Sequence, residues 1–102
     1  MFHYTDKSGY NAIVSQVVWR FIAAPPPGEH PFGAYFTDLP SDTVNLATRL
    51  GIPRRKVAYY FEFVDMGDLK SLPGQRGEHV FYSPDDYEVR RDRQIGHGAT
   101  GL

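Results

Sequence analysis

The stretch Phe32-Gly33-Ala34-Tyr35-Phe36-Thr37-Asp38 decides the fold that the sequence predicts. Residues 34–37 indicate a strand, because an apolar and aromatic run lies between Gly33 and Pro40, two residues that interrupt regular structure. A glycine at the start of a strand lets a ligand approach the backbone closely, and a neighbouring tyrosine ring offers a stacking surface. For this stretch taken alone, the better interpretation is a strand whose aromatic residues fill a core.

Two shorter clusters lie on either side of this stretch. His3-Tyr4-Thr5 stands at a predicted junction of a strand with a helix, and Glu78-His79-Val80-Phe81-Tyr82 opens a strand after the glycine-rich loop over 72–77. Taken alone, the first cluster indicates a half-buried strand with a threonine helix cap, and the second a solvated strand end. A carboxylate at the mouth of a strand is also well placed to face a cleft.

Hydrophobic periodicity predicts the remaining elements. Two helices are expected, one carried by Tyr10, Ile13, Val14 and Val17 after an N-cap among Thr5, Asp6 and Ser8, and one carried by Val44, Ala47 and Leu50 after Ser41-Asp42 and stopped by Gly51. The expected strands are Phe2–Tyr4, Val17–Ile22, Ala34–Thr37, Val57–Val64, His79–Tyr82 and Tyr87–Val89. Strands interrupted by two short helices, without a regular βαβ rhythm, predict an α+β domain. We expect one domain over 1–95, followed by a flexible glycine-rich tail over 96–102.

Composition excludes several classes of protein. The chain has 102 residues, of which 41% are hydrophobic and 15% aromatic, so it is long enough and apolar enough to bury one core. The net charge of −1 gives no indication of a large cationic surface for nucleic acid. The absence of cysteine excludes disulfides and thiolate chemistry.

Metal and membrane sites are not predicted either. The histidines His3, His30, His79 and His97 lack any metal-ligand spacing, and Asp85-Asp86 with Glu88 lies in no cation-binding loop pattern. The sequence contains no signal-peptide pattern and no apolar stretch long enough to cross a bilayer. We therefore expect a domain that needs no metal, makes no membrane contact and acts in a cytoplasm.

Taken in order, the three clusters resemble the ADP-ribosyltransferase superfamily. Phe32 to Asp38 is similar to the Phe-Gly-x-Gly-x-Tyr-Phe-Ala-Asp region of the poly(ADP-ribose) polymerases, with one glycine step missing. The closer likeness is to the small polymorphic-toxin ADP-ribosyltransferase domains with a His-Tyr-Asp triad. It covers His3 to Ile13, Tyr35 to Leu39, Val80 to Pro84 and the closing His97-Gly98.

The resemblance implies a small split β-sandwich of two sheets that holds NAD, as substrate, in a cleft. It implies that His3 bonds the adenosine ribose, that Tyr4, Thr5 and Gly33 help to bind NAD, and that the Tyr35 ring stacks on nicotinamide. His3 and Tyr35 are then expected to line one cleft. The loop over 25–31 would cover the cleft, and Arg20 or Arg54 would pair with the pyrophosphate.

The resemblance also implies a catalytic carboxylate that stabilises an oxocarbenium-like transition state. Glu78 matches the acid of the polymerase-like members, which opens a late strand. The toxin members use an aspartate instead, so Asp85 and Asp38 stay open as alternatives, in that order.

The implied activity is NAD-dependent mono-ADP-ribosylation of a macromolecule by a toxin or effector domain. Two alternatives are an NAD glycohydrolase on the same fold and a catalytically degenerate module that binds a nucleotide or a protein. The partners expected for the leading interpretation are NAD and an unknown macromolecular acceptor. An immunity protein is a further partner that the resemblance allows.

Overall fold

The computed structural model describes residues 1–26, 30–72 and 78–102. Its elements, in chain order, are β1 (Phe2–Thr5), α1 (Lys7–Val14), β2 (Trp19–Phe21), β3 (Ala34–Thr37), α2 (Leu46–Leu50), η1 (Arg54–Val57), β4 (Tyr59–Phe63), β5 (Lys70–Ser71), β6 (Val80–Ser83), β7 (Tyr87–Val89), η3 (Arg91–Arg93) and β8 (Gln94–Ala99). The predicted loops over 25–31 and 72–77 lie partly outside the described residues, at 27–29 and 73–77.

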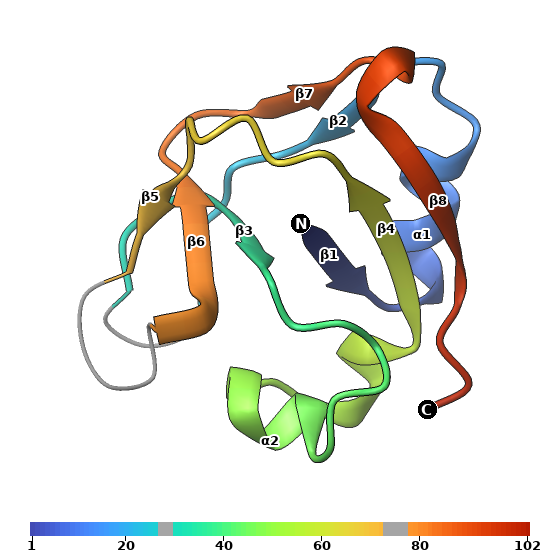
Figure 1. Ribbon diagram of the computed structural model, residues 1–102, viewed down its shortest axis with the longest axis vertical. Helices are drawn as coiled ribbons and strands as arrows, with labels where there is room; N and C mark the ends of the chain where they lie inside the picture. The colour runs from blue at the N-terminus through green and yellow to red at the C-terminus, as the bar shows by residue number, and fades with distance from the viewer. Residues whose placement is uncertain (27–29, 73–77) are drawn as a thin grey trace.

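Two antiparallel sheets carry the fold (Figure 1). The larger sheet has six strands in the order β5-β6-β3-β1-β4-β8, and the smaller sheet pairs β2 with β7. α1 packs beside β2 and β4, and α2 lies at the far end of the molecule from the smaller sheet. The predicted α+β class with short helices is confirmed. No helix in the described ranges is both long and apolar enough to cross a membrane.

The main core lies between the two sheets. Phe61 and Phe63 of β4 are 0% exposed, and they alternate with the less buried Tyr60 and Glu62 on the other face of the strand. The aromatic and apolar residues that complete this core are Trp19, Phe21, Ala34, Phe36, Tyr87 and Val89. A smaller core on the opposite face of β1 consists of Tyr4, Leu39, Leu46 and Val57.

Most of the predicted strands form close to their predicted bounds. β3 and β7 coincide with the predicted ranges, and β1, β2 and β6 differ from them by three residues or fewer at either end. The predicted strand over 57–64 is shortened to β4, because Val57 ends the turn of 3-10 helix η1 and Val64 follows the strand.

The first helix begins where the sequence predicts and ends early. Asp6 is the N-cap, and its carboxylate accepts a hydrogen bond from the amide of Gly9 at 2.8 Å. α1 ends at Val14, and the amide of Gln16 turns back to the carbonyl of Ile13 at 2.9 Å. Val17, predicted to lie on the buried face of the helix, is instead 66% exposed in the connection to β2.

The second helix begins four residues later than Ser41-Asp42 predicts. Asn45 has φ of 57°, a left-handed conformation that an α-helix does not accommodate, so α2 starts only at Leu46. Val44, predicted to lie on the packed face, is 78% exposed. The predicted stop is confirmed, since Gly51 adopts φ of 70° and its amide bonds to the carbonyls of Ala47 and Thr48.

The predicted flexible tail is wrong for residues 96–99. These residues belong to β8, which pairs with β4 from Gln94 to Ala99 and forms one edge of the larger sheet (Figure 1). The sequence does not predict this strand, because Gly96 and Gly98 belong to a residue type that is depleted in strands. Pairing with β4 orders this segment, so the domain extends beyond the boundary predicted at 95.

The larger sheet is split between its two central strands. β1 pairs with β4 along four residues, and β3 pairs with β6 along four residues. β1 and β3 pair only at Phe2 and Thr37. The two halves of the sheet therefore diverge from this point toward Thr5 and Ala34.

Candidate functional site

A histidine side chain bridges the split in the sheet. Nδ1 of His3 lies 2.9 Å from the main-chain carbonyl oxygen of Tyr35. Gly33 exchanges two main-chain hydrogen bonds with Ala24, each of 3.1 Å. Because main-chain groups two residues apart in a strand point to the same side, the carbonyl of Tyr35 points toward β1. The imidazole therefore takes the position of a main-chain amide of β1, which does not reach this carbonyl because β1 and β3 have diverged.

This contact fixes the tautomer of His3. A carbonyl oxygen only accepts hydrogen bonds, so Nδ1 carries the proton and donates it. The ring packs on Phe21 and Phe36, with centroid distances of 4.6 and 5.6 Å. Burial lowers the pKa of His3 to about 4 and outweighs the opposing effect of the bond to Tyr35. At neutral pH the ring is therefore uncharged, and Nε2 is left as a hydrogen-bond acceptor.

The Tyr35 ring leaves β3 on the other face. Phe36 packs in the main core with His3, so the neighbouring Tyr35 points away from that core. Its ring stacks on Tyr82 of β6 at a centroid distance of 5.7 Å, and its hydroxyl donates to the carbonyl of Pro31. Desolvation is the main cause that raises the pKa of the Tyr35 hydroxyl.

The expectation that the side chains of His3 and Tyr35 line one cleft is wrong. Their rings lie on opposite faces of β3, and the contact between the two residues runs through the main chain of Tyr35.

The other predicted NAD-binding residues have structural partners. The Tyr4 hydroxyl donates to the carbonyl of Leu39 at 2.7 Å inside the smaller core, which leaves only the main chain of Tyr4 for a ligand. Burial raises the pKa of this hydroxyl. Thr5 is buried below the first turn of α1, where a Cβ placed on Gly9 would lie 2.0 Å from its Oγ1.

Gly33 is required by the fold itself. A Cβ at this position would lie 2.5 Å from the carbonyl oxygen of Ser83, so the close approach that Gly33 allows is that of β6. The sequence predicts that a ligand approaches the main chain of Gly33 closely, whereas in the structure it is β6 that does so.

The three candidate acids lie at two different ends of the ladder between β3 and β6. Tyr35 pairs with Tyr82 inside this ladder, and Glu78 lies beyond its Val80 end, in a turn of 3-10 helix and not at the opening of the strand as predicted. Asp38 lies at the same end as Glu78 and accepts a hydrogen bond from Nδ1 of His79 at 2.9 Å.

Asp85 lies at the opposite end of this ladder. Ser83 pairs with Ala34, next to Tyr35, and the Ser83 hydroxyl donates to the main-chain carbonyl of Asp85 at 2.7 Å. Gly33, Thr5 and the split of the sheet are at this same end. By register, Asp85 lies toward the end of the ladder where Gly33 and Thr5 lie, Glu78 lies toward the opposite end, and His3 and Tyr35 stand between the two ends.

The two arginines predicted to pair with the pyrophosphate lie in different parts of the fold. Arg20 pairs with Asp86 at 2.9 Å, and the same carboxylate accepts the amide of Ala23 at 2.8 Å, so Asp86 links β2 to the segment that precedes β7. The hydrogen bonds from Ala23 and Arg20 lower the pKa of Asp86. Arg54 lies at the start of η1, on the side of the smaller core.

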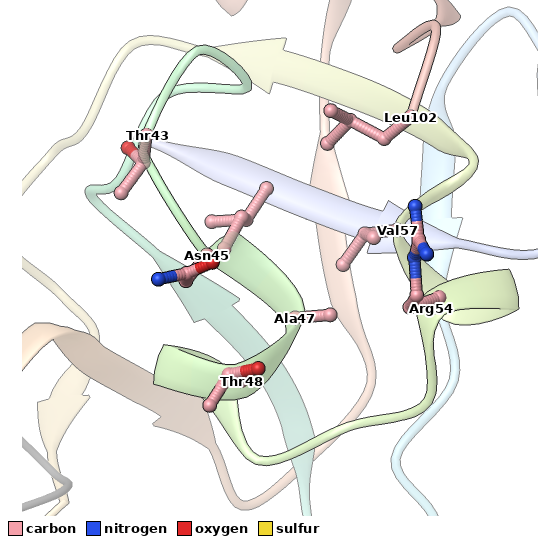
Figure 2. Close-up of a pocket in the computed structure, with 8 residues that line it drawn as sticks. Thr43, Asn45, Ala47, Thr48, Arg54, Val57 and Leu102 are labelled. Carbon is pink, nitrogen blue, oxygen red and sulfur yellow. The ribbon is translucent and has the colours of Figure 1, made fainter.

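Of two cavities in the described parts of the chain, the first includes Arg54 but none of the other candidate residues. Figure 2 shows the first, of about 400 Å³, which is lined by α2 and η1 together with Thr43 and Leu102. The second, of about 420 Å³, lies beside β8 and is lined by Trp19, Arg91, Gln94, Ile95, Gly96 and His97. Neither cavity includes His3, Tyr35, Glu78 or Asp85.

Within residues 1–26, 30–72 and 78–102, no group of three or more histidine, aspartate or glutamate side chains is arranged to hold a metal ion. No family model, curated protein or solved structure matches the chain. The functional assignment therefore depends on the residues themselves.

Proposed function

We propose that this domain binds NAD at the split between β1 and β3 and transfers its ADP-ribose to a macromolecule. The observation that carries the proposal is the hydrogen bond from His3 Nδ1 to the carbonyl of Tyr35, which joins the two residues that the resemblance assigns to the His and Tyr positions of the triad. This bond leaves Nε2 of a neutral imidazole as an acceptor for a ribose hydroxyl.

The acid in this proposal is Asp85, ahead of Glu78 and Asp38. Asp85 is exposed and lies toward the end of β6 where Gly33 and the split are found. During transfer, the bond between nicotinamide and C1 of its ribose breaks, and its electron pair leaves with nicotinamide. A carboxylate beside that ribose stabilises the positive charge that develops on it. The acceptor then forms the new bond to C1 and releases a proton.

One observation favours a second function, that of a non-catalytic binding module. The rings of His3 and Tyr35 lie on opposite faces of β3, and neither the cavity at α2 nor the one at β8 joins them. A degenerate member that holds a nucleotide or a protein without turnover would not need a cavity between the two rings.

Transfer of radiolabel from NAD labelled in its adenylate part separates these functions. The purified domain is incubated with the labelled NAD, with and without a cell lysate, and both protein labelling and free ADP-ribose are measured. Labelling that requires the lysate supports the transferase, and free ADP-ribose without the lysate supports the glycohydrolase. A folded domain that gives neither product contradicts the catalytic proposal and favours the binding module.

A further inference from the structure

The outer edge of β8 is open to another strand. β8 is the last strand of the larger sheet, and none of the other described strands pairs with its outer side. The amide of Thr100 donates to the carbonyl of Ala58 at 2.9 Å. Residues two apart in a strand direct their amides and carbonyls to the same side, so those of Gly98 and Gly96 also point toward β4. The amides and carbonyls of His97 and Ala99 therefore point outward.

This edge lacks the usual protection against pairing. Exposed edge strands commonly carry charged residues or proline, or are very short. β5, the opposite edge, is two residues long and includes Lys70, whereas β8 is six residues long and contains no charge and no proline. A register shift opposite Glu62 and Phe63 leaves Gly96 to Ala99 in regular pairing with β4.

The interior of the fold does not explain the glycine at 96. A Cβ placed there would meet only the Tyr60 hydroxyl, at 3.9 Å, which is an ordinary contact distance. Glycine in an edge strand also permits another backbone to approach closely. Gly96 lies beside the register shift opposite Glu62 and Phe63, where glycine is common, and it leaves space for a partner strand at this edge.

A groove beside the edge indicates what side chains such a partner carries. The cavity of about 420 Å³ runs along β8, with the buried Trp19 at its base and Ile95, 58% exposed, on its wall. Arg91 lines the same cavity and Arg90 precedes it, and both are exposed. The exposed lining of this groove is largely polar and includes the Arg91 guanidinium, so it fits an extended segment that carries a carboxylate.

We propose that β8 is a docking edge for an extended, acidic segment of a partner protein. The segment adds a strand along His97 to Ala99, its alternate side chains enter the groove, and its carboxylate pairs with Arg91. This binding requires neither NAD nor turnover, so it goes beyond the proposed function and is testable without it.

The probe is a synthetic eight-residue peptide of alternating threonine and valine with aspartate at both ends, and its counterpart carries lysine at both ends. Binding to the full chain is measured by fluorescence anisotropy, and protection of the amides of His97 and Ala99 by hydrogen exchange. We expect the aspartate peptide to bind at least tenfold more tightly than the lysine peptide and to protect both amides.

Two variants and one control sharpen this test. Ala99→Pro removes an outward amide that bonds to no described residue, and should abolish binding while the chain stays folded. Arg91→Glu should reverse the preference between the peptides, whereas Arg49→Glu, an exposed arginine on α2, should leave it unchanged. Equal affinity for both peptides, or binding without protection of the two amides, overturns the proposal. Concentration-dependent association of the chain with itself that Ala99→Pro prevents also overturns it, because the occupant is then a second copy.

Discussion

His3 donates its Nδ1 proton to the main-chain carbonyl of Tyr35 across the split that opens between β1 and β3 beyond the pair of Phe2 with Thr37. The bond joins two segments that lie 32 residues apart in the chain, and in the proposed function it leaves Nε2 of the imidazole to face NAD. The structural role of Nδ1 and the proposed binding role of Nε2 are thus divided between the two nitrogens of one ring. This division makes the two roles separable by substitution.

His3→Asn should separate them. The asparagine amide nitrogen occupies nearly the position of Nδ1 and keeps the bond to Tyr35, while the acceptor at Nε2 is lost. We expect a folded protein with NAD affinity reduced about tenfold, equivalent to one lost hydrogen bond of about 1.4 kcal/mol. Calorimetric titration measures the affinity and thermal unfolding checks the fold. Unchanged affinity in a stable His3→Asn protein would show that Nε2 does not contact NAD.

Tyr35→Ala should weaken NAD binding by about 1 kcal/mol or more, roughly fivefold, because a stacking ring is lost. Tyr35→Phe is the matched control, since it keeps the ring and removes only the hydroxyl that bonds Pro31. The same titration compares both variants. If Tyr35→Ala binds NAD as the wild type does, the ring serves only its stacking partner, Tyr82.

Asp85→Asn should lower NAD turnover by roughly 10²-fold with little effect on NAD affinity, because a carboxylate that stabilises the transition state contributes mainly to the rate. Glu78→Gln and Asp38→Asn should be milder. Glu88→Gln, at an exposed position on β7, controls for the loss of one surface charge. Steady-state nicotinamide release compares the four variants with the wild type. A near-normal rate for Asp85→Asn together with an inactive Glu78→Gln would restore Glu78 as the acid.

Stability should fall as the pH is lowered from about 6.5 to about 4. The pKa of His3 is about 4 in the fold against 6.5 for a histidine in the unfolded chain, so in this window the unfolded chain binds a proton that the folded one does not. The loss in the free energy of unfolding is on the order of 3 kcal/mol. Asp6 and Asp86, whose pKa values lie below the usual 3.8, lose their contributions only at lower pH.

Urea unfolding at pH 7 and pH 4.5 measures this dependence. His3→Asn, which does not titrate, should show a flatter pH dependence over the same range. Parallel curves for the two proteins would contradict the buried, neutral state assigned to His3.

Gly9→Ala should destabilise the domain by about 1–3 kcal/mol, although alanine normally favours a helix over glycine. The added Cβ would lie 2.0 Å from Oγ1 of Thr5. Combining Gly9→Ala with Thr5→Ala removes that oxygen, so the double variant should lose less than the sum of the single losses. Chemical denaturation of the four proteins gives the interaction energy, and strict additivity would show that the two side chains do not compete for this space.

The sequence predicted those elements whose local signals agree with their tertiary surroundings. β3 and β7 are apolar and aromatic between clear breaks, and both form at the predicted bounds. The second helix was misplaced because the left-handed conformation of Asn45 has no local signature in the residues before it. β8 was missed because its glycines carry no strand signal and pairing with β4 orders it.

The candidate site was predictable only in part. The motifs marked His3 and Tyr35, and the structure brings the two residues into contact, but the route of that contact through a main-chain carbonyl depends on the split in the sheet. The choice between Glu78 and Asp85 depends on the register of β3 with β6, which the order of residues along the chain does not determine.

The proposed function is tested most sharply by nicotinamide release from NAD by the wild-type domain, compared with His3→Asn and Asp85→Asn in the presence of a cell lysate. Chromatography quantifies nicotinamide, and circular dichroism confirms that all three proteins are folded. We expect release by the wild type, a rate about tenfold lower for His3→Asn at subsaturating NAD, and a rate roughly 10²-fold lower for Asp85→Asn. No release by a folded wild-type domain, or equal release by all three proteins, would contradict NAD-dependent transfer at the split between β1 and β3.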